Sequence, residues 1–355
     1  MPERPVPILP MLLAPGGMIY GLFMSARNNL YERGILETWK APVPVVSVGN
    51  ITTGGTGKTP MVDWIVKFYL EQGRRTAIVS RGYGRRTKGP LLVSDGSKVL
   101  LGSRDAGDEV AMLASRNPST IVVVAERRRE GVELIMREFA GRMPEVIVLD
   151  DAFQHRSIAR DLDIVVLNAR EPFGGGRVLP AGRLREPLQG LGRASLFIVN
   201  KIDDEHRASR IVEELKPLGK PVILARVRPG ELMATDRRGE ISAETGVRAF
   251  AFAGIGSPQG FMHSLAAAGI DVAESCFFRD HQPFTSDSVS SIVKRARRLD
   301  LVPVTTEKDW FRISDDRKLA GMLEEAGCRY LTIEQDIFRG REILEKMLSD
   351  LTRRG

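Results

Sequence analysis

The chain has 355 residues, of which 43% are hydrophobic and 27% are charged; this balance is typical of a globular protein large enough for two domains. Its two cysteines, Cys276 and Cys328, lie far apart, which argues against a disulfide framework or a cysteine metal site and favours a reducing compartment. The net charge of +7 favours phosphate-rich partners or an anionic membrane surface. No lysine-rich tail or mixing of aromatic and basic residues accompanies this charge, so we expect no nucleic-acid partner.

An apolar segment, "VPILPMLLAPGGMIYGLFM", occupies Val6 to Met24. It lacks the basic region and cleavage site of a secretory signal. Arg27, Arg33 and Lys40 follow it, and apolar residues beside cations are typical of a helix at a membrane interface. The alternative, a helix packed on the protein's own core, stays open. A straight transmembrane helix is not expected, because five residues interrupt the segment: Pro7, Pro10, Pro15, Gly16 and Gly17.

Short runs of Val, Ile and Leu then alternate with helical segments such as Pro60–Gln72 and Arg128–Phe139. Such runs are typical of strands buried on both faces, and the alternation predicts an α/β fold with a mainly parallel sheet. The predicted strands are Val45–Val48, Thr76–Ser80, Ile121–Ala125, Val146–Leu149, Ile164–Leu167 and Leu196–Asn200.

The pattern changes near Pro221, where "VILARVRPGELMATDRRGEI" predicts an antiparallel ribbon with turns at Pro229-Gly230 and Arg238-Gly239. A second α/β set follows, with strands at Ala249–Ala253, Val272–Phe277, Val302–Thr305 and Tyr330–Ile333. We therefore predict an N-terminal segment at 1–40, a first α/β domain at 41–220, a β-ribbon linker at 221–245 and a smaller α/β domain at 246–355.

The loop "TGGTGKT" follows a predicted strand and opens a predicted helix, which is the setting of a phosphate-binding P-loop. Its glycines let backbone N–H groups turn toward phosphate oxygens. Lys58 is expected to reach the β and γ phosphates, and Thr59 to place its hydroxyl on Mg²⁺. One position departs from the pattern, because Thr52 stands where the first glycine is expected. The predicted nucleotide-binding residues are Thr53, Gly54, Gly55, Thr56, Gly57, Lys58 and Thr59.

The run "VIVLDD" ends in Asp150 and Asp151. An acid near the metal is expected after such a strand in P-loop enzymes. The carboxyl ends of parallel strands also form the ligand crevice of an open α/β sheet. The alternative of a surface turn is disfavoured by the four apolar residues that come first.

The run "NKID", Asn200 to Asp203, resembles the guanine-reading motif of GTPases and also follows an apolar strand. A GTPase would need a glycine shortly after its metal-binding Asp, and "DDAFQH" has none. This motif supports an alternative hypothesis, a P-loop GTPase or a metallochaperone-like NTPase.

Two acids, Asp108 and Glu109, stand in the loop "DAGDE" before a predicted helix. They are candidates for a base and a metal ligand. The alternative is that Asp108 caps the helix, and the local sequence favours this alternative.

Two arginine-rich loops, "RGYGRR" and "LPAGRLREP", suit phosphate or sugar because a guanidinium binds phosphate with two parallel hydrogen bonds. Solvated loops are the alternative. Arg127–Arg129 is interpreted mainly as a solvated helix face. His155 follows the Asp pair and His281 lies in "FFRDHQPFT"; each suits a base partner or a turn histidine bonded to backbone. The loop candidates are Arg81, Tyr83, Arg85, Arg183 and Arg185.

Taken together, the motifs resemble the tetraacyldisaccharide 4'-kinases, the lipid A 4'-kinases of bacteria with an outer membrane. They run in order over nearly the whole chain: "SVGNITTGGTGKTP", "SRGYGR", "GDE", "LDDAFQH", "LPAGRLREP", "FAGIGSPQGF", "DHQPFT" and "TTEKDWFR". One departure is Arg183, where many relatives are expected to have proline.

The resemblance implies an ATP-dependent kinase that phosphorylates the 4'-hydroxyl of tetraacyldisaccharide 1-phosphate, giving lipid IVA in lipopolysaccharide biosynthesis. It implies two α/β domains joined by a β-ribbon, the first a P-loop NTPase-like domain, with closure needed for chemistry. ATP and Mg²⁺ would be the cofactors, and the acylated disaccharide and the inner-membrane surface the partners. The chain would act as a monomer, peripheral or monotopic, at the cytoplasmic face of the bacterial inner membrane.

The resemblance also implies roles for single residues. Asp108 would accept the proton of the hydroxyl, and His281 would orient Asp108. Predicted catalytic residues are Asp108, His281, Lys58, Asp150 and Asp151. Predicted metal ligands are Thr59, Glu109 and Asp150. Predicted substrate residues are Asn50, Arg81, Tyr83, Arg85, Gln154, His155, Arg183 and Arg185.

Overall fold

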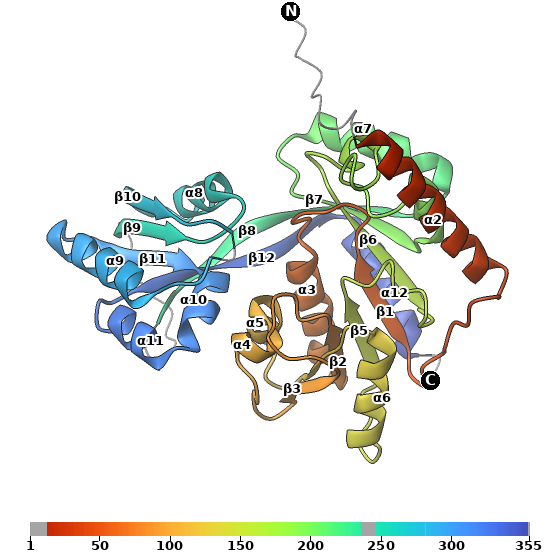
Figure 1. The fold of residues 1–355 in the computed structure, drawn as a ribbon, viewed down its shortest axis with the longest axis horizontal. Helices are drawn as coiled ribbons and strands as arrows, with labels where there is room; N and C mark the ends of the chain where they lie inside the picture. The colour runs from red at the N-terminus through yellow and green to blue at the C-terminus, as the bar shows by residue number, and fades with distance from the viewer. Residues whose placement is uncertain (1–12, 236–245, 281, 354–355) are drawn as a thin grey trace, which may run out of the picture. The chain divides into compact units, whose positions relative to one another are not determined.

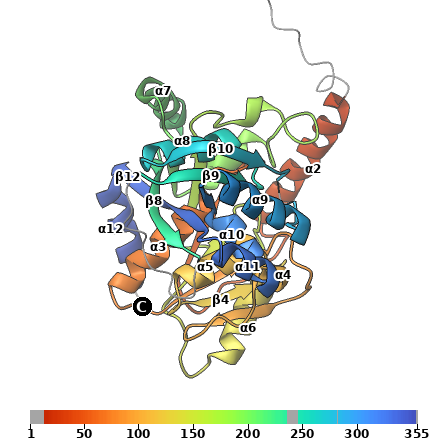
Figure 2. The ribbon, with the colours of Figure 1, turned by 90° about the vertical axis from the view of Figure 1, so that its left-hand side faces the viewer.

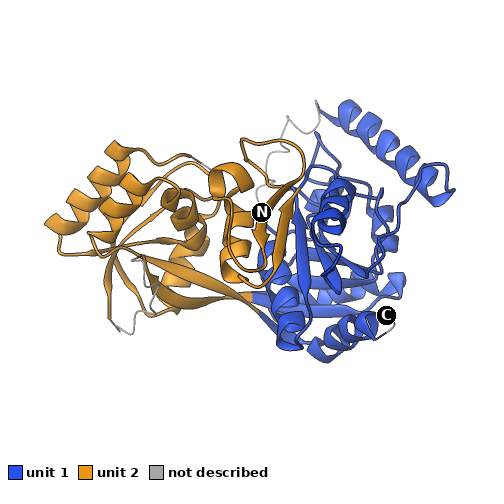
Figure 3. Ribbon diagram, turned by 90° about the horizontal axis from the view of Figure 1, so that it is seen from below, with its two compact units in different colours: residues 1–81, 125–226, 336–355 blue, residues 82–124, 227–335 orange. Residues whose placement is uncertain are grey.

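The computed structural model of the chain describes residues 13–235, 246–280 and 282–353. The chain divides into two compact units, shown in different colours in Figure 3. Unit 1 contains residues 1–81, 125–226 and 336–355, and unit 2 contains residues 82–124 and 227–335.

Unit 1 is a parallel sheet with the strand order β8-β7-β6-β1-β5-β2, in which β1 lies between β5 and β6 (Figure 1). The pairings of β1, β5 and β7 with their neighbours are all parallel. The sheet is made of β1 (Val45–Gly49), β2 (Thr76–Ser80), β5 (Val146–Asp150), β6 (Leu162–Asn168), β7 (Leu196–Asn200) and the start of β8 (Val222–Ala234). Nearly every residue of these central strands is buried, as expected of a parallel sheet covered on both faces.

Helices accompany this sheet in the order expected for an α/β unit. They are α2 (Ala14–Glu32), α3 (Lys58–Glu71), α6 (Arg128–Glu138), α7 (Glu205–Leu215) and α12 (Arg341–Thr352). Short 3₁₀-helical segments are η1 (Gly174–Gly176), η2 (Leu188–Arg193) and η3 (Lys216–Leu218).

Unit 2 contains a parallel set of strands in the order β10-β9-β11-β12 and an antiparallel pair, β3 with β4. Figure 2 faces this unit and shows α8 beside β10, and α9, α10 and α11 together. The strands are β3 (Leu91–Asp95), β4 (Ile121–Val124), β9 (Arg248–Ala253), β10 (Asp271–Phe277), β11 (Val302–Thr306) and β12 (Arg329–Arg339). The helices are α4 (Ser103–Ala106), α5 (Asp108–Arg116), α8 (Pro258–Ala267), α9 (Ser286–Arg298), α10 (Glu307–Ser314) and α11 (Arg317–Glu324).

The β-ribbon differs from the one that the sequence predicted. β8 and β12 are neighbours, and their side-chain contacts run in opposite order, Arg226 with Asp336 and Glu231 with Thr332, so the two strands are antiparallel. Pro229-Gly230 is no turn, because β8 continues through it. Glycine is needed at 230 instead because a Cβ there would lie 2.5 Å from the Thr332 hydroxyl oxygen. The predicted turn at Arg238-Gly239 lies outside the described residues.

The observed α/β architecture with mainly parallel strands confirms the predicted fold class. The predicted strands are all present, and β3 is the addition. β12 continues well past the predicted end at Ile333, to Arg339. The contact-based units group residues 82–124 with the C-terminal part, whereas the sequence placed them inside a domain at 41–220. The predicted domain boundaries stay a prediction, since compact grouping is not a test of independent folding.

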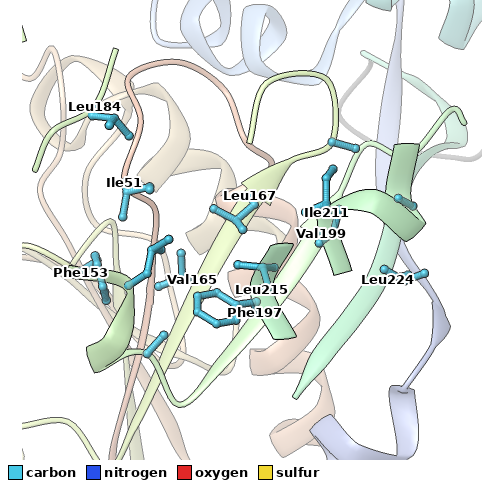
Figure 4. Close-up of a cluster of buried hydrophobic side chains, with 14 residues drawn as sticks. Ile51, Phe153, Val165, Leu167, Leu184, Phe197, Val199, Ile211, Leu215 and Leu224 are labelled. Carbon is cyan, nitrogen blue, oxygen red and sulfur yellow. The ribbon is translucent and has the colours of Figure 1, made fainter. Parts of the chain in front are cut away.

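One apolar cluster in unit 1 packs β6 and β7 against α7 and the loops at the ends of the strands (Figure 4). Phe153 lies in this cluster and is fully buried. The guanidinium of Arg193 lies 4.5 Å from the centre of the Phe153 ring, a cation–π contact. This cluster therefore anchors the loop that follows Asp150 and Asp151.

We expect Gly49→Ala to destabilise unit 1 by about 1–3 kcal/mol, because it overpacks this anchor. A Cβ at Gly49 would lie 2.5 Å from the Phe153 Cβ and 2.6 Å from the Phe153 backbone nitrogen. At about 2–4 °C per kcal/mol, thermal unfolding followed by circular dichroism should show a clear drop in the midpoint. Gly141→Ala is the control, since nothing lies within 4 Å of its Cβ position. Equal unfolding midpoints for Gly49→Ala and Gly141→Ala would contradict the close approach of Gly49 to Phe153.

Candidate active site

The loop between β1 and α3 has the backbone of a phosphate cradle. Gly54 and Gly57 have φ angles of 105° and 88°, which only glycine adopts readily. The helix α3 begins at Lys58, so its free N–H groups and its dipole favour an anion at this loop. A Cβ on Gly54 would clash with Arg183 Nη2, so this glycine also makes room for the arginine.

Thr52 explains why the first glycine of the pattern is dispensable. It is buried and forms an antiparallel bridge with Leu184. The Thr53 N–H donates to the Arg183 carbonyl (2.8 Å), and the Arg185 N–H donates to the Ile51 carbonyl (2.7 Å). Position 52 is thus strand-like, and its φ is not positive. A threonine fits there, and only the later glycines must take left-handed conformations.

Side chains from β1 and β7 support the loop from behind. The Asn50 amide donates to the Thr52 carbonyl (2.9 Å) and to the Thr56 hydroxyl (3.3 Å). The Asn200 amide donates to the Thr56 carbonyl (3.2 Å), and Lys201 Nζ donates to the Gly55 carbonyl (2.9 Å). Asn50 is fully buried, so the structure gives it a loop-supporting position, and its predicted substrate contact is untested. The run "NKID" likewise supplies two loop supports that the sequence interpretation missed.

Asp150 and Asp151 end β5 beside the loop. Asp150 is buried and accepts a hydrogen bond from the Ser80 hydroxyl (2.8 Å). Lys58 Nζ lies 3.4 Å from Asp151 Oδ1, and Arg185 Nη1 donates to both oxygens of Asp151 at 2.9 Å. Burial opposes ionisation of Asp151, but the charges of Lys58 and Arg185 outweigh it and lower its pKa to about 2. The carboxylate is therefore charged at any physiological pH.

Arg128 is fully buried, so the interpretation of Arg127–Arg129 as mainly a solvated helix face is wrong for this residue. Its guanidinium donates to the carbonyls of Asp150 (2.7 and 3.1 Å), Asp151 (3.3 Å) and Ala125 (2.8 Å). These contacts fix the backbone at the end of β5, where Asp151 has a positive φ of 49°. A signal was available: Arg128, Val132 and Ile135 are spaced along one helix face, and all are buried.

Gln154 and His155 follow on the same loop. The Gln154 amide donates to the Asn50 carbonyl (2.9 Å) and to Glu186 (2.8 Å). Glu186 is fully buried and also accepts hydrogen bonds from Asn28 (3.0 Å) and Arg193 (2.8 Å). Sequence reasoning missed Glu186. Burial and the nearby positive charge lower the pKa of His155 to about 3, so its imidazole is neutral at pH 7.

The other predicted substrate residues of unit 1 lie on exposed loops. Arg183 pairs with Glu171 (2.5 Å) and donates to the Thr53 carbonyl (2.9 Å), so it contacts the phosphate loop itself. Arg81 is exposed at the end of β2, and its charge is one of those that lower the pKa of His155.

The helix α2 lies against the loop that carries Arg185. The Tyr20 hydroxyl donates to the Arg185 carbonyl (2.8 Å), and a Cβ on Gly17 would lie 2.9 Å from the Ala181 Cβ. The opposite face is apolar and exposed, with exposed fractions of 64–71% at Met18, Ile19, Leu22 and Phe23. No helix within the described residues is long and apolar enough to cross a membrane.

In unit 2, Asp108 and Glu109 open α5, and both face α10. Arg312 Nε donates to Asp108 Oδ2 (2.9 Å), and Lys308 Nζ lies 3.3 Å from Glu109 Oε1. The helix cap is Gly107, which has no side chain, so the alternative that Asp108 is the N-cap is wrong. The predicted partner His281 lies outside the described residues.

Tyr83 and Arg85 stand in the loop before β3. The Tyr83 side chain is 73% exposed. Arg85 donates to the Gly89 carbonyl (2.7 Å), which makes it a support of its own loop. Their predicted substrate contacts are untested.

The predicted metal ligands divide between the units, Thr59 and Asp150 in unit 1 and Glu109 in unit 2. Over the part of the chain that the structure describes, no group of three or more His, Cys, Asp or Glu side chains is placed to hold a metal ion. The oxygen donors at the end of β5 are of the type that Mg²⁺ prefers, so the chemistry of the site fits this ion.

Comparison with known proteins places this geometry in a family. The family model described as tetraacyldisaccharide-1-P 4'-kinase matches residues 9–353. Curated relatives named tetraacyldisaccharide 4'-kinase include those of Chlorobaculum parvum, 61% identical over 95% of this chain and 93% of the relative, and Chlorobaculum tepidum, 60% identical over 97% and 98%. A crystal structure of LpxK from Aquifex aeolicus in complex with ATP is 31% identical, with a TM-score of 0.76 over 97% of this chain and 99% of that one.

Since the family model covers nearly the whole chain and the relatives match it end to end, the chain belongs to the tetraacyldisaccharide 4'-kinase family.

Proposed function

We propose that this chain transfers the γ-phosphoryl group of ATP to the 4'-hydroxyl of tetraacyldisaccharide 1-phosphate, in lipid A biosynthesis. The observation that carries the proposal is the P-loop with Lys58 beside Asp151 at the carboxyl ends of β1 and β5. This arrangement would bring the nucleotide phosphates close to the acid pair, whose Asp150 is the proposed metal ligand. The acceptor substrate is inferred from the name of the family and of its relatives.

The residues divide the work as follows. Backbone N–H groups of Gly54 to Thr59 bind the phosphates, and Lys58 neutralises charge that develops on the transferred group. The acceptor oxygen forms a bond to the γ-phosphorus while the bond to the β-phosphate oxygen breaks, and ADP leaves. Asp108 takes the proton of the hydroxyl, and His281 orients Asp108.

Thr59 and Asp150 would hold Mg²⁺, with Glu109 as a further ligand, and the ion would neutralise charge on the phosphates. Asp151 is already paired with Lys58 and Arg185, so its carboxylate orients these two cations. Arg185 pairs with Asp151, and Gln154 and His155 follow Asp151 on the same loop. These three residues are assigned to the disaccharide and its 1-phosphate. Tyr83, Arg81 and Arg85 are assigned to the same substrate.

The guanine-reading hypothesis has no support from the geometry of "NKID". Asn200 and Lys201 face the phosphate loop. The Asp203 carboxylate pairs with Arg170 (3.0 Å) and Arg207 (3.6 Å), so a base reader there would first have to break two ion pairs.

We further propose that the exposed face of α2 rests on the cytoplasmic face of the inner membrane, where an acylated acceptor resides, and that the protein is a peripheral monomer. Met18, Ile19, Leu22 and Phe23 supply an apolar stripe at helical spacing. The opposite face is held on the loop of Arg185, so the membrane and the acceptor site lie on neighbouring segments.

The decisive experiment is transfer of label from γ-³²P-ATP to tetraacyldisaccharide 1-phosphate in detergent micelles, with the product resolved by thin-layer chromatography. We expect a labelled lipid, with Lys58→Ala as the impaired control. Equal rates with GTP and ATP, or a hydrolysis rate that does not change when the lipid is added, would contradict the kinase proposal and favour an NTPase.

Asp108→Ala should reduce transfer by about 10²–10⁴-fold, the usual contribution of a general base. Binding of ATP, measured by isothermal calorimetry, should stay within about twofold, because the P-loop is untouched. Near-normal transfer would remove Asp108 from the mechanism.

The double substitution Leu22→Ser/Phe23→Ser should weaken association with anionic lipid vesicles at least tenfold in a sedimentation assay, since burying each side chain contributes about 1.5–3 kcal/mol. Asn29→Ser, exposed on the same helix, is the matched control and should bind vesicles as the wild type does. Unchanged partitioning of the double variant would show that this face does not contact the membrane.

A further inference from the structure

Arg312 lies where four of the sequence motifs of unit 2 meet. It belongs to α10 in "TTEKDWFR", and its side chain is 11% exposed. Its guanidinium contacts Asp108 of "GDE", Asp309 of its own helix, and the backbone carbonyls of Gly254 and Gln282. Neither the resemblance nor the predicted catalytic roles gives this arginine a task.

A buried acid holds the guanidinium at Nη1. Asp309 is fully buried and lies 3.3 Å from Arg312 Nη1. It also accepts hydrogen bonds from the Gly254 N–H (3.0 Å) and the Thr306 hydroxyl (2.7 Å). An acid held this firmly sets the plane of the guanidinium, because the donors of arginine form a rigid fork.

The same guanidinium also contacts Asp108, the predicted base, and the segment that directly follows its predicted partner in the chain. Arg312 Nε donates to Asp108 Oδ2 (2.9 Å). Nη1 donates to the Gln282 carbonyl (3.2 Å), next to His281 in the chain. The Phe284 ring, 6.0 Å from the guanidinium carbon, covers the group from the same loop. A single side chain thus ties the loop "DHQPFT" to the first turn of α5.

We propose that Arg312, held by Asp309, is the positioning residue that orients the Asp108 carboxylate for the acceptor hydroxyl. The inference rests on the proposed function and adds a residue to it. A base must lie within about 3 Å of the proton that it takes, and a displacement of about 1 Å costs on the order of 10²-fold in rate. A carboxylate on a short side chain at a helix end needs such a fixed partner to hold one rotamer.

The chain offers a matched control in the same helix pair. Arg116 of α5 pairs with Glu307 of α10 and is also partly buried. It lies about 12 Å along the helix from Asp108, at about 1.5 Å per residue. Arg312→Met should lower kcat by about 10–10²-fold, while KM for ATP changes less than twofold. Arg116→Met should destabilise unit 2 and leave kcat within about twofold. Arg312→Lys, which restores one cationic donor without the fork, should recover part of kcat.

Two measurements separate positioning from general stability. In an Asp108→Ala background, Arg312→Met should cost nothing further in residual transfer, since the group it orients is absent. A crystal structure of Arg312→Met should show the Asp108 carboxylate in another rotamer or in several. Wild-type kcat in Arg312→Met, a full additional loss in the Asp108→Ala background, or an unmoved carboxylate would each overturn the assignment.

The crystal structure does not depend on turnover. If the wild-type chain fails to phosphorylate the lipid, the proposed function falls, while the position of Asp108 in the variant still decides whether Arg312 orients it.

Discussion

The site depends on two adjacent carboxylates, Asp150 and Asp151, at the carboxyl end of β5. Burying like charges side by side is costly unless cations compensate them. Lys58, Arg185 and the buried Arg128 supply that compensation, two through the Asp151 carboxylate and one through backbone carbonyls. Because Lys58 is also the P-loop lysine, the acid pair and the phosphate loop are held in one electrostatic arrangement before any nucleotide arrives.

That arrangement extends to the exposed helix through two consecutive residues. Arg185 binds Asp151 with its side chain and accepts the Tyr20 hydroxyl with its carbonyl. Glu186 joins Asn28 of α2 to Gln154. The helix α2, which presents apolar side chains outward, is therefore hydrogen-bonded to Arg185 and Glu186. Arg185 in turn binds Asp151, and Glu186 binds Gln154 on the loop that follows the acid pair. The segment Arg185–Glu186 therefore connects the proposed lipid-contacting helix with the residues of the site.

Much of this was readable from the sequence, because it depends on local pattern. The P-loop, the acid pair and the parallel strands follow from glycine spacing and from runs of Val and Ile. Arg128 and Arg312 were not found, because charge runs such as "AERRRE" and "EKDWFR" are usually solvated, and burial of one member is decided by packing. Glu186 was not found either, because the loop "LPAGRLREP" gives no local sign that its acid is buried. The position around the helix could have indicated that Arg128 is buried, since it shares a face with Val132 and Ile135. The predicted turn at Pro229-Gly230 was wrong, because Gly230 is required by the close approach of β12 and not by a turn.

Both units use an arginine to hold a candidate acid in place. In each unit an arginine binds backbone carbonyls beside a candidate acid. Arg128 binds those of Asp150 and Asp151. Arg312 binds those of Gly254 and Gln282, while its Nε donates to the Asp108 carboxylate. A lysine has a point charge and cannot make this fork of contacts. Arg128 therefore fixes the backbone that carries the Asp pair, and Arg312 fixes the Asp108 carboxylate against the neighbouring loops. For phosphoryl transfer, where catalysis is mainly positioning and charge stabilisation, these two effects are the ones that matter.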